Sequence, residues 1–367
     1  MVFDVVIVGG GVIGMLSALE LAAAGRRVAL LEAGVVAREA SWAGGGIVSP
    51  LYPWRYSEAV WALARHSQEA YPALAESLLE RTGIDPEHHV TGLYWLDLDD
   101  EEQALAWARE HDRPLQSVPM TQVRTAIPAL GPDYARALFM PGVANIRNPR
   151  LGQALRAALQ AEANVSLFEH SRVLGLETEG ERVRGVRTAA GTLLAEQVVL
   201  CAGAWTAQLL APLGLELPVE PVKGQMILYR CDPTLLPHMV LSSRRYAIPR
   251  RDGHILVGST LEHVGFDKTP SAEALQSLQR TAAQLLPALA DAPVVGHWAG
   301  LRPGSPEGIP YIGAVPQVEG LWLNCGHHRN GLVMAPASCR LLADLMLGRA
   351  VGLNPQPYAP ARLSQAG

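Results

Sequence analysis

The sequence predicts an α/β protein with two structural units, and two observations support this. Residues 4–8 (DVVIV) form a short β-branched run typical of a buried parallel strand, and a glycine-rich turn links them to an Ala- and Leu-rich segment typical of a helix. The 367 residues also include 35 Gly and 27 Pro but only 6% aromatic residues. This composition favours an α/β protein with many tight turns over a helical bundle. At roughly 150 residues per domain, the length suggests two domains.

Charge and cysteine usage limit the class of protein and its partners. The net charge is −5, and no basic run is longer than a pair such as Arg244-Arg245, so we expect no nucleic-acid partner. No apolar run approaches the roughly 20 residues of a membrane-spanning helix, and the first residues lack the pattern of a signal peptide. The four cysteines show no C-x-x-C spacing, so we expect no disulfide framework. These features predict a cytoplasmic protein without a membrane partner.

The first forty residues contain the pattern of a dinucleotide-binding unit. A G-x-G-x-x-G motif stands at Gly9, Gly11 and Gly14, and a second strand over residues 27–31 ends at Glu32. Gly9 allows the tight turn, Gly11 lets the backbone approach a pyrophosphate, and Gly14 lets the helix pack closely on the strand. The helix N-terminus offers N–H groups to phosphates, and Glu32 can accept hydrogen bonds from ribose hydroxyls. The unit predicts a dinucleotide but does not separate NAD from FAD.

Three later segments favour FAD. Residues 38–47 (REASWAGGGI) expose backbone N–H groups at three glycines and add the Ser41 hydroxyl, which suits a loop lying against an extended cofactor. A flexible surface loop is the alternative reading. Residues 198–205 (VVLCAGAW) form a predicted buried strand ending in small residues. The turn 326–331 (GHHRNG) follows a strand and precedes a helix over 332–347, with Asn330 as the expected N-cap. That helix end would stabilise a reduced, anionic flavin.

These segments, with residues 298–304 (WAGLRPG), resemble the D-amino acid oxidase family of flavoproteins, and within it the thiamine-pathway glycine oxidases. The resemblance covers nearly the whole chain, and its specific part is the spacing from Tyr246 to Arg302 to Arg329. It implies a discontinuous, Rossmann-type FAD-binding domain and a substrate domain with a mixed, mainly antiparallel sheet. The FAD-binding domain would comprise residues 1–85, 149–218 and 299–367, and the substrate domain residues 86–148 and 219–298. Strands are expected within 92–98 and 246–258, and helices over 149–163 and 271–286.

The resemblance also implies the site residues. Arg302 would bind the substrate carboxylate, Tyr246 would line the pocket, and Arg329 would lie near the site, all three with catalytic roles. FAD would be bound noncovalently, because residues 303–308 (PGSPEG) lack the cysteine through which some relatives attach it. The residues expected to contact the cofactor are Gly9, Gly11, Val12, Ile13, Gly14, Glu32, Ala33, Ala40, Ser41, Gly45, Gly46, Ile47, Val173, Gly203, His327, His328, Arg329, Asn330, Gly331 and Leu332.

The residue types leave alternatives open at each of these positions. An arginine among apolar neighbours must find an anion or reach water, and a carboxylate matches its planar fork. Arg302 could therefore bind a ligand or pair with a local acid such as Glu307. Tyr246 could instead pack in a sheet, and Arg329 could be a surface residue. The pairs His88-His89 and His327-His328 lack metal-ligand spacing, so no metal is expected.

The activity implied by the resemblance is oxidative deamination of glycine and other small amino acids, including sarcosine and D-amino acids. Hydride transfer from the α-carbon to flavin N5 would give an α-keto acid (glyoxylate from glycine) and ammonia or an amine, with dioxygen reduced to hydrogen peroxide. Close relatives suggest a homo-oligomer. A D-amino acid dehydrogenase using a quinone or other carrier is the main alternative. An NAD-dependent dehydrogenase and a non-catalytic FAD-binding module are alternatives of other classes.

Overall fold

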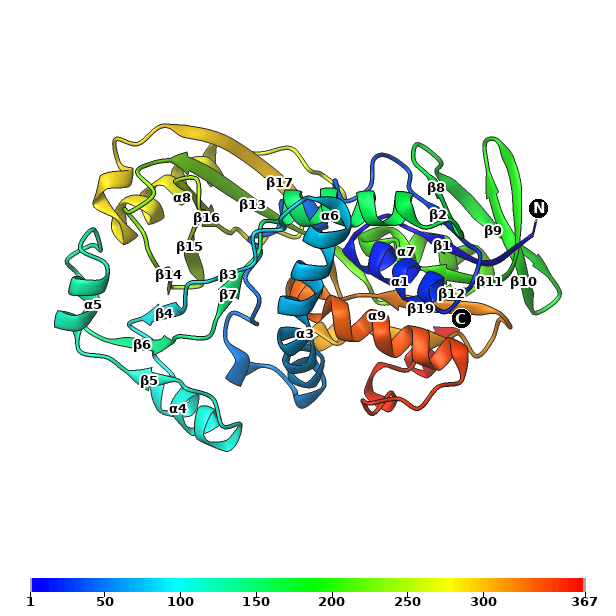
Figure 1. The fold of residues 1–367 in the computed structure, drawn as a ribbon, viewed down its shortest axis with the longest axis horizontal. Coiled ribbons are helices and arrows are strands. Elements are labelled where there is room, and N and C mark those ends of the chain that lie inside the picture. Colours follow the sequence, from blue (N-terminus) through cyan, green and yellow to red (C-terminus); the bar gives the residue numbers. More distant parts are fainter. Residues whose placement is uncertain (1, 366–367) are drawn as a thin grey trace.

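The first sheet of the protein forms around its N-terminal strand. A computed structural model describes residues 2–365 and contains two eight-stranded sheets (Figure 1). In the first sheet, the pairings from β19 through β11, β1 and β2 to β8 are parallel, and strands β1 and β2 are largely buried, as expected for a parallel sheet. An antiparallel edge strand and an antiparallel hairpin complete it. The order is β18 (Tyr311–Ala314), β19 (Leu321–Cys325), β11 (Gly191–Leu200), β1 (Phe3–Val8), β2 (Val28–Leu31) and β8 (Val165–Phe168), with β9 (Val173–Glu179) and β10 (Arg182–Thr188) extending from β11.

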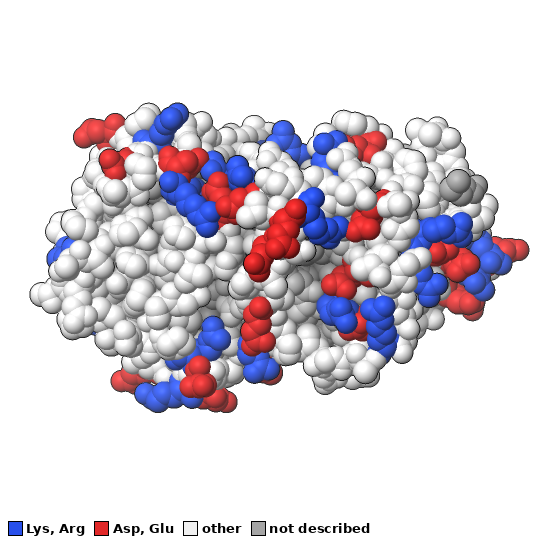
Figure 2. Space-filling view, in the orientation of Figure 1, with Lys and Arg blue, Asp and Glu red and all other residues white. Residues whose placement is uncertain are grey.

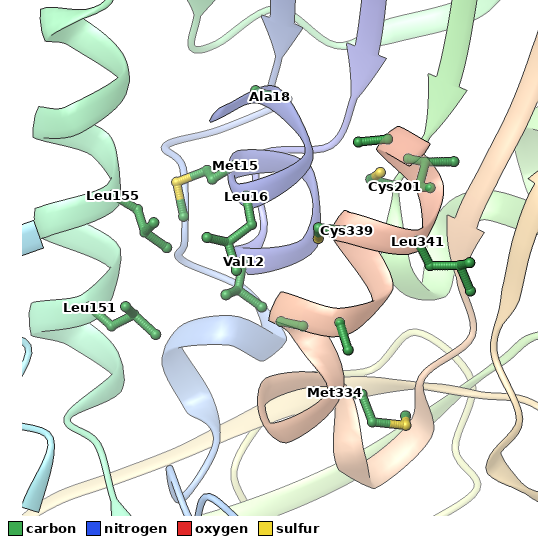
Figure 3. Packing of buried hydrophobic residues seen from close by; sticks show 14 of the residues in the cluster. Val12, Met15, Leu16, Ala18, Leu151, Leu155, Cys201, Met334, Cys339 and Leu341 are labelled. Atoms are coloured by element: carbon green, nitrogen blue, oxygen red, sulfur yellow. The ribbon is translucent and has the colours of Figure 1, made fainter. Parts of the chain in front are cut away.

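Helices cover this sheet and build the largest apolar core. Val12, Met15 and Leu16 of α1 lie between side chains of α6 and α9, among them Leu155 and Cys339 (Figure 3). All of these residues are at most 6% exposed. Burying each large apolar side chain contributes about 1.5–3 kcal/mol, so this packing fixes α1 and α9 relative to the sheet. The helices are α1 (Val12–Ala23), α3 (Glu58–Thr82), α6 (Asn148–Ala161) and α9 (Gly331–Leu347).

The second sheet is mixed and mainly antiparallel, as predicted. Its only parallel pairing joins β14 and β4, and the other pairings are antiparallel. Helix α8 (Ala272–Leu285) packs on it, and the hydroxyl of Ser271 accepts a hydrogen bond from the N–H of Ala274 at 3.2 Å. The strands in order are β17 (Val294–Gly304), β13 (Glu220–Arg230), β16 (His254–Gly258), β15 (Arg245–Pro249), β14 (Met239–Ser242), β4 (Leu93–Leu96), β6 (Ala137–Met140) and β5 (Gln116–Ser117).

Strand β17 determines where the predicted anchor residue lies. It pairs with β13 from Glu220 opposite Gly304 to Tyr229 opposite Val294. The domain boundary predicted before residue 299 therefore falls inside a continuous strand. Arg302 belongs to the second sheet, because the ladder with β13 continues past that boundary.

The remaining elements are short and mostly peripheral. Helices α4 and α5 lie at the far end of the second sheet, away from the parallel sheet (Figure 1). Two small ladders each join two strands, β12 with β20 and β3 with β7. The bounds are α2 (Ala40–Ala43), α4 (Glu101–Glu110), α5 (Met120–Ala126), α7 (Thr206–Leu210), β3 (His89–Val90), β7 (Ala144–Asn145), β12 (Leu215–Glu216) and β20 (Ser364–Gln365), with short 3₁₀ turns that include η2 (Gly203–Trp205) and η6 (His328–Asn330).

The surface and the cysteines are unremarkable in chemical terms. All four cysteines are free, and Cys201, Cys325 and Cys339 are buried. On the face shown in Figure 2, basic and acidic side chains are intermixed at the upper left, in the centre and at the right-hand end. Within residues 2–365, no helix is both long and apolar enough to span a membrane.

Candidate active site

A cavity of about 480 Å³ is lined by residues of both sheets. The turn after β1 and the segments after β2, β11 and β19 supply one group of lining residues. Strands β13, β15 and β17 supply another, including Tyr246 and Arg302. Every residue that the sequence predicted to contact substrate or cofactor lines this cavity, except Gly14. The structure therefore brings together side chains that are more than 300 positions apart in the sequence.

Two glycines let the strands and α1 meet at the floor of the cavity. Gly9 has a φ of +108°, and a Cβ there would lie 2.5 Å from the carbonyl oxygen of Cys201. A Cβ at Gly14 would collide with the carbonyl of Gly9. Gly14 thus does not face a ligand; its lack of a side chain allows the close packing of helix on turn that the motif predicts.

The carboxylate of Glu32 is held at the end of β2 by backbone donors. Its Oε2 accepts a hydrogen bond from the N–H of Gly10 at 2.8 Å, and its Oε1 accepts one from Gly34 at 2.9 Å. A carboxylate has about four acceptor sites, so two bonds leave room for hydroxyl donors. Val173 lines the same cavity. This arrangement fits the predicted contact with a ribose.

The glycine-rich segment after β2 is anchored at both ends. It contains the short helix α2, and the Ser41 hydroxyl accepts a hydrogen bond from the N–H of Val12 at 2.8 Å. Its glycine end is held by Arg250, which is only 7% exposed and donates to the carbonyl of Gly45 at 2.7 Å. Burial lowers the pKa of Arg250 to about 10. Sequence reasoning missed Arg250, because an Arg-Arg pair after a strand looks like a solvated surface.

Four polar atoms in the cavity wall are buried without a hydrogen-bond partner in the described chain. They are Oδ1 of Asn148, Oδ1 of Asn324, Nε2 of His328 and Nδ2 of Asn330. An unsatisfied buried polar group costs about 1–3 kcal/mol, and a polar ligand in the cavity would relieve this cost for these four atoms. Asn330 is the N-cap residue of α9, as predicted, and its side chain makes no capping hydrogen bond. The sequence signal for Asn324 was a lone amide in the apolar run LWLNC.

The histidines next to α9 are held neutral by their surroundings. His327 is 2% exposed, and its Nε2 lies 3.0 Å from the hydroxyl of Ser338. Burial lowers the pKa of His327 to about 3 and, with help from nearby arginines, that of His328 to about 4. In residues 2–365, no group of three or more His, Cys, Asp or Glu side chains could hold a metal ion.

Arg302 is positioned by neutral acceptors and has no acidic partner. Its Nη1 donates to the carbonyls of Lys223 at 3.3 Å and Thr260 at 3.2 Å, and its Nη2 donates to the Ser259 hydroxyl at 2.8 Å. No ion pair in the described chain involves Arg302, and the carboxylate whose charge acts on its pKa is Glu262, so the alternative pairing with Glu307 is not formed. Burial lowers the pKa of Arg302. Three of its five N–H groups are used, which leaves Nε–H and one Nη2–H for a ligand.

Tyr246, on the second sheet, and Arg329, just before α9, line the same cavity. Tyr246, on β15, is 6% exposed, and its hydroxyl lies 3.5 Å from the sulfur of Met226. A Cβ at Gly45 would lie 3.2 Å from that hydroxyl, so the glycine brings the loop backbone close to the phenol. Arg329 lies in η6, immediately before α9, and is half-buried. Its charge contributes to lowering the pKa of Arg302, which places two cations near one another.

Comparison with known proteins identifies the family. Residues 4–345 match the model of a family described as FAD dependent oxidoreductase. The chain belongs to this family. A glycine oxidase from Pseudomonas aeruginosa is 65% identical over 97% of this chain and 98% of its own length. The crystal structure of a glycine oxidase from Geobacillus kaustophilus has a TM-score of 0.93 and 35% identity, and the match covers 98% of each chain.

Membership of this family decides between the two dinucleotides in favour of FAD. The residues in place fit this cofactor: the glycine turn leaves backbone space, and Asn148, Asn324, His328 and Asn330 supply unpartnered polar atoms along the cavity. The N-terminus of α9 adds backbone N–H groups that have no partner inside the helix, and Gly331 and Leu332 line the cavity there.

We predict that FAD is held noncovalently. All four cysteines are free, and none lies in residues 303–308, so the described chain offers no thiol just past Arg302 for a flavin linkage. Protein precipitated with acid should release its yellow colour into the supernatant, as measured by absorbance. Colour retained in a washed pellet would contradict this prediction.

The buried histidines should make folding stability depend on pH. Their folded pKa values of about 3 and about 4 lie below the usual 6.5, so the unfolded chain binds more protons between these limits. Stability should therefore fall as the pH is lowered from about 6.5 towards 4. Melting temperatures at a series of pH values should show this slope, and His327→Gln should reduce it. The exposed His170→Gln is the control; an equal slope in His327→Gln would disprove the assignment.

Proposed function

We propose that this protein is a glycine oxidase, which uses FAD to deaminate glycine and other small amino acids such as sarcosine and D-amino acids. The products would be an α-keto acid (glyoxylate from glycine), ammonia or an amine, and hydrogen peroxide from dioxygen. The 65% identity to the Pseudomonas aeruginosa glycine oxidase over almost the whole chain supports this proposal.

One observation supports a carboxylate-bearing amino acid as the class of substrate. Arg302 keeps two N–H groups for a ligand, has no acidic partner, and lines the same cavity as the glycine turn that accommodates FAD. A carboxylate matches this fork and would compensate the buried charge. An amino acid bound through its carboxylate would therefore lie in the cavity shared with the cofactor.

In the proposed mechanism, FAD held in this cavity would supply the chemistry of hydride acceptance and dioxygen reduction. The protein supplies orientation. Arg302 fixes the carboxylate, and the buried Tyr246 offers its hydroxyl as a second polar contact. Holding the reactants in one geometry can contribute several kcal/mol to lowering the barrier.

The charges around the cavity indicate how the substrate amine loses its proton. The only acidic residues of the described chain that line the cavity are Glu32 and Glu39. Glu32 is bound to backbone N–H groups at the end of β2, and Glu39 forms an ion pair with Lys268 at 2.7 Å. Neither is placed beside Arg302. Burial lowers the pKa of His327 to about 3 and that of His328 to about 4, so neither histidine is basic enough to take a proton from the amine. We infer that the amine enters the reaction already deprotonated from solvent.

We further propose a cytoplasmic location and a homo-oligomeric assembly. Four free cysteines suit a reducing compartment. The oligomer is expected from the family resemblance, and light scattering of the purified protein would measure it directly.

The proposed function is tested by the visible spectrum of the purified holoenzyme before and after anaerobic addition of glycine. Bleaching of the flavin bands would support it, and sarcosine, D-alanine and D-proline would then define the substrate range. Oxygen consumption with hydrogen peroxide release would separate an oxidase from a dehydrogenase that uses another carrier. Flavin bands that persist with all four substrates would refute the proposal.

Arg302→Ala should lower kcat/KM for glycine by about two to three powers of ten. Removing one partner of a buried ion pair costs roughly 3–5 kcal/mol, because the other charge is left without compensation. Steady-state kinetics would measure the effect, with Arg184→Ala on the exposed β9–β10 hairpin as the control. A loss smaller than tenfold would remove Arg302 from the role of anchor.

The value of kcat/KM should rise with pH up to the pKa of the substrate ammonium group. Only the neutral amine can release a hydride, and the cavity provides no base beside Arg302 to deprotonate it. The inflection should therefore move when sarcosine replaces glycine, since the pKa belongs to the substrate. A profile that is flat, or whose inflection is the same for both substrates, would contradict this account.

A further inference from the structure

Gly224 lies directly beneath the guanidinium of Arg302. In the ladder between β13 and β17, Val222 is opposite Arg302 and Gly224 is opposite Gly300. Gly224 and Arg302 are therefore diagonal neighbours on one face of the sheet, within reach of a long side chain. The arginine side chain crosses from β17 to β13 and lies against the bare backbone of Gly224.

A glycine is required at position 224 because there is no room for a side chain, and not because of the backbone conformation. Gly224 is not among the glycines with positive φ, so its backbone is open to other residues. A Cβ on Gly224, however, would overlap Cζ, Nη1 and Nη2 of Arg302, which are its three nearest atoms. An alanine could be accommodated only if the guanidinium moved away from the strand.

The guanidinium cannot move without losing its hydrogen bonds. Its acceptors are the carbonyl of Lys223 and two groups of the segment 259–271. That segment is tied to the same strand by both neighbours of Gly224. The buried ammonium of Lys223 donates to Asp267 at 2.9 Å and to the carbonyl of Thr269 at 2.6 Å. The N–H of Gln225 donates to the hydroxyl of Thr260 at 2.9 Å.

We propose that Gly224 is a positioning residue for Arg302. By lacking a side chain, it lets the guanidinium lie flat on β13, so that three N–H groups bind the protein and two remain for the substrate carboxylate. This inference rests on the proposed function, in which Arg302 is the carboxylate anchor. Gly224 would thus affect substrate binding although it has no functional group of its own.

Gly224→Ala should raise KM for glycine and the Kd for acetate by about 10- to 100-fold, with a smaller change in kcat. A misplacement of about 1 Å at an orienting group can cost roughly 10²-fold. Acetate is a probe of the anchor alone, and its binding to the holoenzyme is measured from the perturbed flavin spectrum. Gly142→Ala is the matched control, since a Cβ there has nothing within 4 Å and the φ is not positive.

A double-mutant cycle with Arg302→Ala separates positioning from general damage. If Gly224 acts through Arg302, adding Gly224→Ala to Arg302→Ala should change the Kd for acetate by less than twofold. If the single variant fails to fold, the double variant should fold, because the clash is removed. Additive effects, or failure of both variants to fold, would overturn the proposal.

The two proposals fail in different ways. A loss of less than tenfold in kcat/KM for Arg302→Ala would refute the anchor in the proposed function. A strong defect in Arg302→Ala, together with wild-type acetate affinity in Gly224→Ala, would refute only the positioning role of Gly224. Equal melting temperatures of Gly224→Ala and Gly142→Ala would show that a loss of acetate affinity is local to the site.

Discussion

The close approach of backbone to backbone at the turn after β1 is the contact on which the site depends. Without side chains on Gly9 and Gly14, α1 can rest against the turn while the turn touches the segment after β11. Helix α9 then packs on α1 (Figure 3), and β19 pairs with β11. The turn at residues 326–331 therefore opens onto the same cavity as the glycine motif, although it is more than 300 residues away.

The second sheet contributes side chains to the cavity because polar contacts hold it against the glycine-rich segment after β2. Arg250 leaves the end of β15 and binds the Gly45 carbonyl, and the Trp298 indole on β17 donates to the carbonyl of Ala43 at 3.1 Å. Both contacts attach the second sheet to the glycine-rich segment that lines the cavity. Arg302 and Tyr246 are thus placed against the cofactor-binding loop by neighbours on their own strands.

Local patterns made much of the site predictable, and tertiary contacts account for the rest. The glycine motif and Glu32 are separated by about twenty residues of regular structure, so their spacing in the sequence was sufficient to predict that both belong to one binding site. Asn148 and Arg250 were missed because the residues around them come from distant segments. The role of each polar side chain depends on the groups against which it is buried. The position of residue 299 inside β17 also depends on a distant segment, because the pairing of residues 294–304 with β13 is not visible in the local sequence.

The electrostatics of the cavity link these features to function. Burial keeps His327 and His328 uncharged, with pKa values of about 3 and about 4, so these histidines add no positive charge to that of Arg302 and Arg329. That charge does not change between pH 5 and 8, because a guanidinium remains protonated there even when burial lowers its pKa. A cavity with a constant cationic wall and no nearby base selects an anionic substrate. It leaves the protonation of the amine to be set by the substrate itself.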